Sequence, residues 1–249
     1  MAVRKRSSAM SPAEQTMFIN VMKQLINAPG NPNPYGIMVD HHRDMSHRMH
    51  GSMGGMVDTV GRQRFLPWHR VYLLKIEQMG QAINPAFFIP YWDWATSPAI
   101  PPWFAGFGPL TVKVAGIDIN VNRNPPAAVP NNTLPTNLQV TSCAGKTTYT
   151  SFTRAVEEGF GVVPAPVGSG MHNRVHVWCN GTMSFTQISP ADPLFWLHHA
   201  MIDRMWSRWQ SAHPGLNPNL AAPFNVMDPW PNTAASVKAI TTLGYSYGP

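Results

Sequence analysis

One helix can be placed from the sequence alone: DPLFWLHHAMIDRMWSRW, residues 192–209. Asp192 is a suitable N-cap and Pro193 a suitable first helical residue, so we expect a helix to begin here. Apolar side chains then recur at intervals of three and four, which predicts one face turned to the core. That face consists of Phe195, His199, Ile202, Trp206 and Trp209. A histidine on such a face is either packed in the core or a metal ligand.

Asp203 stands four residues after His199, on the same face of the expected helix. A carboxylate there could accept the free N–H of the imidazole and set its tautomer for metal binding. The alternative is a salt bridge or cap with a nearby arginine, Arg204 or Arg208. The spacing favours His199 as a ligand.

A second pair of histidines, His172 and His176, is separated by four residues, which places both imidazoles on one helix face. Chance or core packing explains such a pair about as well as chelation does. No glutamate follows His172, so the H-E-x-x-H pattern of zinc proteases is absent. With His199, this pair makes one candidate triad.

The other candidate triad is His42, His50 and His69. His69 belongs to a helix that we expect to begin near Pro67. The side chains on the same face as His69 are apolar, so His69 should point into the core. They are Tyr72, Leu73, Ile76 and Met79.

The positions of the first two ligands are less regular. Eight residues separate His42 from His50, so His50 must lie beyond the end of the helix that carries His42. The glycines that follow His50 permit this. His41 and His47 remain alternatives, because His47 and His50 at i and i+3 could chelate a metal by themselves.

The type of ligand narrows the choice of metal. Imidazole suits copper, zinc, iron and nickel, whereas hard cations prefer carboxylates. Three histidines without a carboxylate can also form a catalytic zinc site. Two such sites facing each other in one bundle are better explained by a pair of copper ions, which would handle dioxygen.

The rest of the chain predicts a mainly α fold. Further helices are expected from Ser11 to before Pro29, from about Tyr35 into the late forties, from Thr150 to Glu158, and over 170–178. Residues 96–150 are expected to be loop-rich, with a short hairpin over Val112–Asn122. The resulting prediction is a single domain over 1–249: a four-helix-bundle core that houses the metal pair, long proline-rich loops and a minor β-hairpin.

Composition excludes several classes of protein. The formal charge of +6 comes mainly from scarce acids, and the basic residues are scattered, so we expect no nucleic-acid partner. No apolar run reaches about 18 residues, so no membrane span is expected. The start MAVRKRSSAM has no apolar stretch behind it, which predicts a cytoplasmic protein without a secretory signal. Cys143 and Cys179 could form one disulfide or none.

Several segments resemble the signature blocks of the tyrosinase family, the type-3 dicopper phenol oxidases. They are FLPWHR at 65–70, PYWDW at 90–94, HNRVH at 172–176 and DPLFWLHH at 192–199, the last continuing through Asp203-Arg204 and Trp206. Together they span nearly the whole chain. The resemblance implies two copper ions with O₂ as co-substrate, held by His42, His50, His69, His172, His176 and His199. It favours His199 over His198, because the family ligand is followed by three residues and Asp.

The resemblance also assigns supporting residues. Glu158, with Glu157 as the alternative, resembles the family's water-holding glutamate, and Asn173 its partner. Phe195 should stack over the site and limit the approach of substrate. Arg48 stands where plant and many fungal members carry a thioether cysteine, so no such crosslink is expected. The motif Tyr245-Ser246-Tyr247 should pair with an arginine near the N-terminus, for which Arg4 is the candidate.

The resemblance implies a bacterial-type enzyme without a C-terminal lid domain. Its activity would be ortho-hydroxylation of monophenols such as tyrosine and oxidation of o-diphenols to o-quinones. One alternative is a catechol or o-aminophenol oxidase without monophenolase activity, and another is a haemocyanin-like O₂ carrier. The expected partners are small phenolic substrates. A separate copper-loading or covering protein, and export with such a helper, stay open, as does the oligomeric state.

Overall fold

The computed structural model describes residues 1–30, 32–53, 56–126, 134–158 and 170–248. Its α-helices are α1 (Pro12–Ile26), α2 (Pro34–Arg43), α3 (Thr59–Ile83), α4 (Asn137–Ala144), α5 (Tyr149–Glu157), α6 (Met171–Cys179) and α7 (Leu194–Ala212). Short 3-10 helices are η1 (Ser7–Ala9), η2 (Met45–His47), η3 (Pro102–Phe107), η4 (Gly181–Ser184), η5 (Ser189–Ala191) and η6 (Ile240–Leu243). The strands are β1 (Ala2–Arg4), β2 (Ser52–Met53), β3 (Met56–Val57), β4 (Leu110–Val114), β5 (Ile117–Val121) and β6 (Tyr245–Tyr247).

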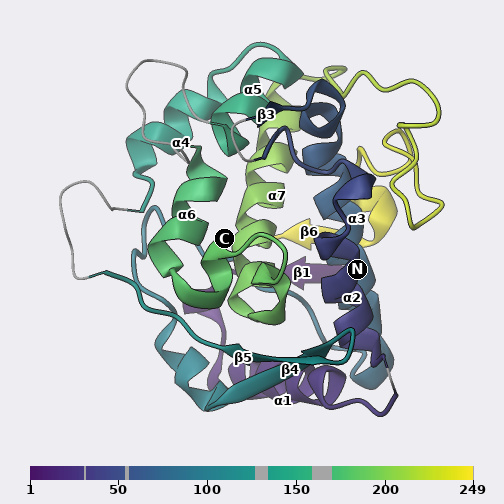
Figure 1. Cartoon of the computed structure of the whole chain (residues 1–249). Helices are drawn as coiled ribbons and strands as arrows, with labels where there is room; N and C mark the ends of the chain where they lie inside the picture. Colours follow the sequence, from purple (N-terminus) through teal and green to yellow (C-terminus); the bar gives the residue numbers. More distant parts are fainter. Residues whose placement is uncertain (31, 54–55, 127–133, 159–169, 249) are drawn as a thin grey trace.

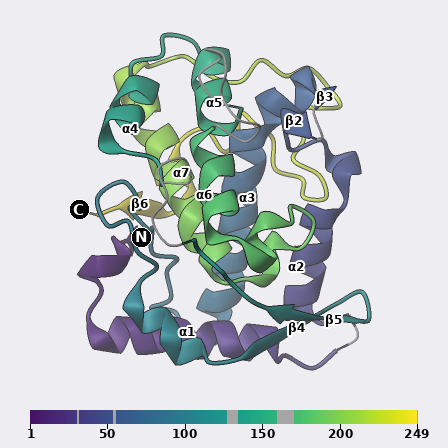
Figure 2. The same cartoon turned by 60° about the vertical axis from the view of Figure 1, so that its left-hand side comes forward.

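Four helices, α2, α3, α6 and α7, surround the centre of the molecule, as Figures 1 and 2 show from two sides. Helix α3 packs against α7 and α5, and α6 packs against the same two helices. Helix α1 crosses one end of this bundle beside the antiparallel hairpin of β4 and β5. The predicted mainly helical fold with a four-helix core and a minor hairpin is confirmed.

The beginnings of two helices show the same capping signal. The Ser11 hydroxyl accepts the N–H of Glu14, and the Glu14 carboxylate accepts the N–H of Ser11, so α1 starts where the sequence predicts. Thr136 and Gln139 form the same reciprocal pair at the start of α4. The prediction of a loop-rich stretch over 96–150 missed that helix.

Helix α3 starts at Thr59, eight residues before the predicted start near Pro67. The Asp58 side chain caps it. Pro67 lies inside the helix, where its missing N–H leaves the carbonyl of Gln63 without its usual partner. The Tyr149 hydroxyl of α5 donates to that carbonyl at 3.0 Å, which offsets the loss. A tertiary contact thus overrides the proline signal.

Helix α2 ends at Arg43 and does not continue into the late forties. Asp44 is extended, and its side chain accepts the N–H of Ser46, which starts the separate turn η2. His50 therefore lies beyond the end of the helix that carries His42, as predicted.

The two ends of the described chain meet. Strand β1 runs parallel to β6, with Ala2 opposite Tyr245 and Arg4 opposite Tyr247. The Arg4 guanidinium lies 3.6 Å from the centre of the Tyr245 ring and donates to the Tyr247 hydroxyl at 3.1 Å. The predicted pairing of Arg4 with the tyrosine motif is confirmed.

Two further predictions concern membrane-spanning helices and the two cysteines. None of the helices in the described ranges is long and apolar enough to cross a membrane. Cys143 and Cys179 are both buried free thiols, so the disulfide that the sequence left open is not formed.

Candidate metal centre

Two groups of histidines face the centre of the four-helix bundle. Helices α2 and α3 and the segment between them supply the first group, His42, His50 and His69. Helices α6 and α7 supply the second group, His172, His176, His198 and His199. In each group, the nitrogens that could bind a metal all lie within 4.8 Å of one another. The structure therefore brings all six predicted ligands into two clusters.

In the second group, the Nε2 atoms of three histidines converge. Nε2 of His172 lies 3.1 Å from that of His176 and 3.2 Å from that of His199. The Met183 carbonyl lies 2.7 Å from Nδ1 of His176, and Asn173 Oδ1 lies 2.7 Å from Nδ1 of His172. These acceptors keep the proton on Nδ1 and leave a lone pair on Nε2. Converging lone pairs of this kind suit a shared cation.

His198 differs from its neighbour His199 in its hydrogen bonding. The indole N–H of Trp94 donates to Nδ1 of His198 at 3.2 Å. An indole only donates, so Nδ1 of His198 is the acceptor and the proton of the neutral ring is on Nε2. That proton blocks the nitrogen that a metal would need. The tautomer thus favours His199 as the third member of the triad.

The first group has the same kind of arrangement. Nδ1 of His69 donates to the Phe65 carbonyl at 2.8 Å, and its Nε2 lies 3.4 Å from Nε2 of His42. The His50 ring is centred 5.2 Å from that of His42 and 5.3 Å from that of His69. Nε2 of His50 is buried and has no hydrogen-bond partner among the described residues. A buried nitrogen of this kind needs a ligand, and a metal ion would satisfy it.

The chain around His50 is irregular and is held by close contacts. The His50 carbonyl approaches α3 so closely that a Cβ on Gly61 would lie 1.9 Å from it. The Gly51 N–H donates to both carboxylate oxygens of Glu157 at 2.9 Å. Glu157 also accepts from Nδ1 of His50 at 3.1 Å, so this ring too presents Nε2 to the site.

Glu157 and Glu158 are placed differently, although the sequence prediction favoured Glu158 for the water-holding role. Glu157 is 1% exposed and contacts His50, whereas Glu158 forms an ion pair with Arg62 at 2.5 Å. Consecutive helical residues point about 100° apart, so only one of the two can face the bundle. The structure places Glu157 beside His50 and Glu158 against Arg62.

Burial determines the protonation of the histidines. It lowers the pKa of five imidazoles well below the usual 6.5, and neighbouring histidines lower it further: His42, His69, His172, His198 and His199. Burial also lowers the pKa of His176, to about 4. Burial raises the pKa of Glu157, although its hydrogen bond with His50 opposes the shift. These six histidines with lowered pKa values are therefore neutral near pH 7, and the neutral imidazole is the form that binds metal.

The two triads lie ring against ring. His69 of the first stacks on His199 of the second, with ring centres 4.5 Å apart and planes 17° from parallel. Phe195 contacts one histidine of each triad: its ring stacks on His199 at 4.0 Å and meets His42 edge-on at 5.1 Å. Phe195 therefore packs against the two histidine triads, while its effect on the approach of substrate stays a prediction.

Asp203 does not support His199 as the sequence predicted. One of its oxygens accepts from Arg70 at 2.5 Å and the other from the Tyr245 hydroxyl at 2.6 Å. Arg4 also donates to it, at 3.3 Å. Nδ1 of His199 is left without a partner among the described residues. Asp203 instead joins α7 to α3 and to the terminal strands, because arginines outcompete an imidazole for a buried carboxylate.

The two alternative histidines lie outside both groups. His47 pairs with the carboxylate of Asp228, which also accepts from Arg64. His41 packs edge-on against Trp230. These contacts hold the segment around Asp228 to the bundle and take both rings away from the metal-binding clusters.

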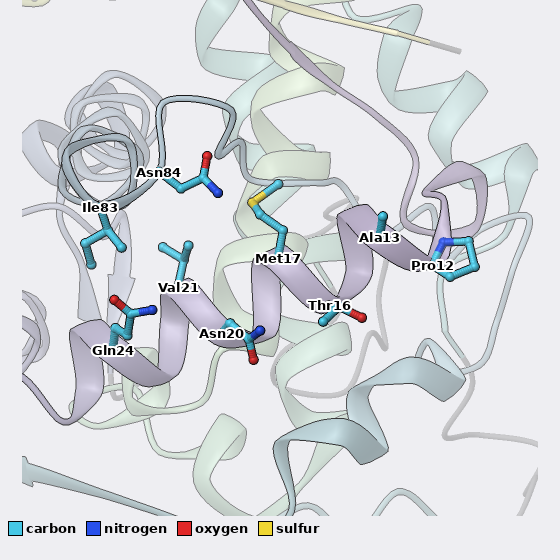
Figure 3. A pocket seen from close by; sticks show the side chains of 9 residues that line it. All are labelled: Pro12, Ala13, Thr16, Met17, Asn20, Val21, Gln24, Ile83 and Asn84. Carbon is cyan, nitrogen blue, oxygen red and sulfur yellow. The ribbon is translucent and has the colours of Figure 1, made fainter.

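A hollow of about 670 Å³ lies elsewhere on the molecule, between α1 and the end of α3 (Figure 3). Its lining is made of amide and aliphatic side chains such as Asn20, Gln24 and Ile83. It offers no titratable group for chemistry, so the histidine clusters remain the candidate site.

A helical bundle with two buried histidine triads placed ring to ring defines a class of protein that can hold a pair of metal ions. Residues 32–125 and 110–212 match the family model Tyrosinase, described as the common central domain of tyrosinase. The chain belongs to the tyrosinase family, whose members are type-3 dicopper oxidases that use O₂.

Individual relatives agree with this assignment. The tyrosinase of Streptomyces glaucescens is 33% identical over 279 aligned positions, which cover 99% of both chains. The grixazone synthase of Streptomyces griseus is 33% identical over 60% of this chain and 66% of its own. A functional unit of octopus hemocyanin shares the fold, with a TM-score of 0.71 and 22% identity over 100% of this chain and 68% of that one.

Proposed function

We propose that this protein hydroxylates monophenols such as tyrosine at the ortho position and oxidises the resulting o-diphenols to o-quinones with O₂. Membership of the tyrosinase family supports this, as does the similarity to a Streptomyces tyrosinase along the whole chain. The observation that carries the proposal is the stacking of His69 on His199, because it sets two histidine triads side by side. Small phenols are the expected substrates.

We assign one copper ion to each triad. The ligands are His42, His50 and His69 for the first ion, and His172, His176 and His199 for the second. The converging Nε2 atoms and the unpartnered Nε2 of His50 support this assignment, since neutral imidazoles suit copper. Bound copper would supply the redox chemistry with O₂, and the protein would supply position and electrostatics.

The hydroxylation needs a group that takes the phenolic proton, because a phenol with a pKa of about 10 is mostly protonated near neutral pH. We assign this to a water held by Glu157 and oriented by Asn173. Glu157 lies at the end of α5 beside His50, and Asn173 lies next to His172 in α6. The two helix ends touch: a Cβ on Gly170, the N-cap of α6, would lie 1.9 Å from the Glu157 carbonyl.

Access to the site is limited by Phe195. Its ring is fully buried and lies against histidines of both triads. We infer that a flat phenol ring approaches edge-on past Phe195 and that bulkier rings are excluded. We also infer that residues 1–249 act as one catalytic domain, because buried apolar residues from Met10 to Val237 form a single cluster.

The role of Asn173 can be tested by Asn173→Ala. We expect monophenolase activity with tyrosine to fall far more than diphenolase activity with a catechol, because only the first reaction needs the phenolic proton removed by a positioned base. Asn20→Ala, on the exposed face of α1, is the control and should leave both rates unchanged. Equal losses of the two activities in Asn173→Ala would contradict the assignment.

A second candidate is a catechol or o-aminophenol oxidase without monophenolase activity. The similarity to a protein named grixazone synthase supports it, since that relative is named for another product. Turnover with tyrosine and with a catechol, followed by quinone formation, separates the candidates. Quinone from both substrates supports the first, and quinone from the catechol alone supports the second. Reversible O₂ binding without quinone would indicate a carrier.

A further inference from the structure

Methionines gather on the chain that leads into and out of His50. The sequence holds 15 methionines, and four of them fall between positions 45 and 56. Met45 begins η2, Met49 directly precedes His50, and Met56 begins β3. Their exposure decreases toward the metal centre: Met56 is 77% exposed, Met45 is half-buried and Met49 is 1% exposed.

These three thioethers line one hollow together with His50. The hollow has a volume of about 510 Å³ and lies between η2, β3 and the start of α3. It opens to solvent at Met56 and reaches inward to Met49 and His50. His50 therefore belongs both to this hollow and to the first histidine triad.

The other charged groups of the hollow are already paired. The Asp58 carboxylate accepts from Arg48 at 2.6 and 2.8 Å and also caps the first N–H groups of α3. A carboxylate used in this way is a poor ligand for calcium, magnesium or zinc. The metal-binding side chains that remain are His50 and the soft sulfur atoms, and sulfur selects Cu(I) over hard cations.

We propose that this thioether hollow, defined by Met45, Met49 and Met56, is an entry site that takes up Cu(I) and passes it to the first histidine triad through His50. Neutral thioethers would bind the ion briefly, and the three imidazoles would then hold it more tightly. The inference rests on the proposed copper ligands. It adds a route by which copper reaches the first histidine triad, which is more deeply buried than the hollow.

The test is the rate of copper uptake by metal-free protein. Cu(I) is supplied anaerobically as its bicinchoninate complex, and transfer is followed by the loss of the complex's colour. Leucine matches methionine in volume but lacks sulfur, so we expect the double variant Met45→Leu/Met56→Leu to load several-fold more slowly. The same final copper content as the wild type is expected. Met17→Leu, at a half-buried site in α1, is the matched control and should load at the wild-type rate.

Three results would overturn the proposal. The double variant could load at the control rate, which overturns the entry route and leaves the ligand assignment intact. Uptake of Cu(I) and of Cu(II) could slow equally, which would show that sulfur softness is not the cause. A wild-type protein that binds no copper would overturn the ligand assignment and the entry route together. Matching thermal unfolding of the variants and the wild type excludes a folding defect.

Discussion

The two histidine triads present the same nitrogens but are built differently. In the second, His172 and His176 share one face of α6, and regular helix geometry sets their separation. In the first, His42 lies in the last turn of a helix, His69 lies in the middle of another, and His50 lies on irregular chain between them. Contacts with Glu157 and Gly61 hold His50 in place. The geometry of the first triad therefore depends on tertiary contacts, whereas the spacing of His172 and His176 in the second depends on helix α6.

Replacing one ligand in each triad should have the largest effect. We expect His176→Ala to bind one copper ion fewer than the wild type, and His50→Ala likewise, with loss of the ion from opposite triads. Turnover should fall by more than the roughly 100-fold that loss of a supporting hydrogen bond can cost. Metal analysis of the purified variants, with His213→Ala as the control, checks the copper content. A variant that keeps both ions would show that the replaced histidine is not a ligand.

Breaking the ion pair between Asp203 and Arg70 should have the next largest effect. Asp203, one turn after His199, is joined to Arg70, which directly follows His69. We expect Asp203→Asn to lower the free energy of unfolding by about 3 to 5 kcal/mol, because it leaves buried arginine charge without its partner. Urea unfolding measures this. A loss of unfolding free energy below about 1 kcal/mol, the range found for exposed ion pairs, would contradict this role of Asp203.

The same carboxylate predicts a pH dependence. Burial alone would raise the pKa of Asp203, but Arg70 and Arg4 together hold it below its ordinary value of 3.8. A carboxylate whose pKa is lowered by folding stabilises the folded state at pH values above its ordinary pKa. This stabilisation is lost as the pH falls through the lower pKa of the folded state. Unfolding free energy of the wild type should therefore decrease as pH drops below about 4. The decrease should be shallower in Asp203→Asn, and an identical slope would contradict the assignment.

Replacing Glu157 or its neighbour Glu158 should have smaller and different effects on copper affinity. Glu157→Gln removes the carboxylate that orients His50, so we expect the first copper ion to bind about 10- to 100-fold more weakly. The second ion should be affected little. Glu158→Gln is the matched control, because that side chain contacts Arg62 rather than His50. Competition with a copper chelator measures both affinities. An equal effect of the two variants would contradict the placement of Glu157.

The sequence predicted the parts of this molecule that depend on regular spacing. The separation of His172 and His176, the stripe through His199 and the capping box at Ser11 all became features of the structure. The displacement of His50 beyond its helix also followed from counting residues. The start of α3 did not, because the Tyr149 hydroxyl compensates for Pro67 from another helix.

The parts that could not be predicted depend on tertiary contacts. The Phe65 and Met183 carbonyls set the tautomers of His69 and His176, yet every residue carries a carbonyl, so no sequence signal marks these two. Which of Glu157 and Glu158 contacts His50 depends on where α5 ends, to within one residue. Helix ends are the least predictable feature of a sequence.

We propose that each chain holds two copper ions in facing triads and uses them with O₂. The most direct test is to measure copper per chain in reconstituted protein while following oxygen consumption with tyrosine as substrate. We expect two copper ions per chain and consumption of O₂ that begins only as the second ion is bound. Full activity with a single copper ion per chain would contradict it.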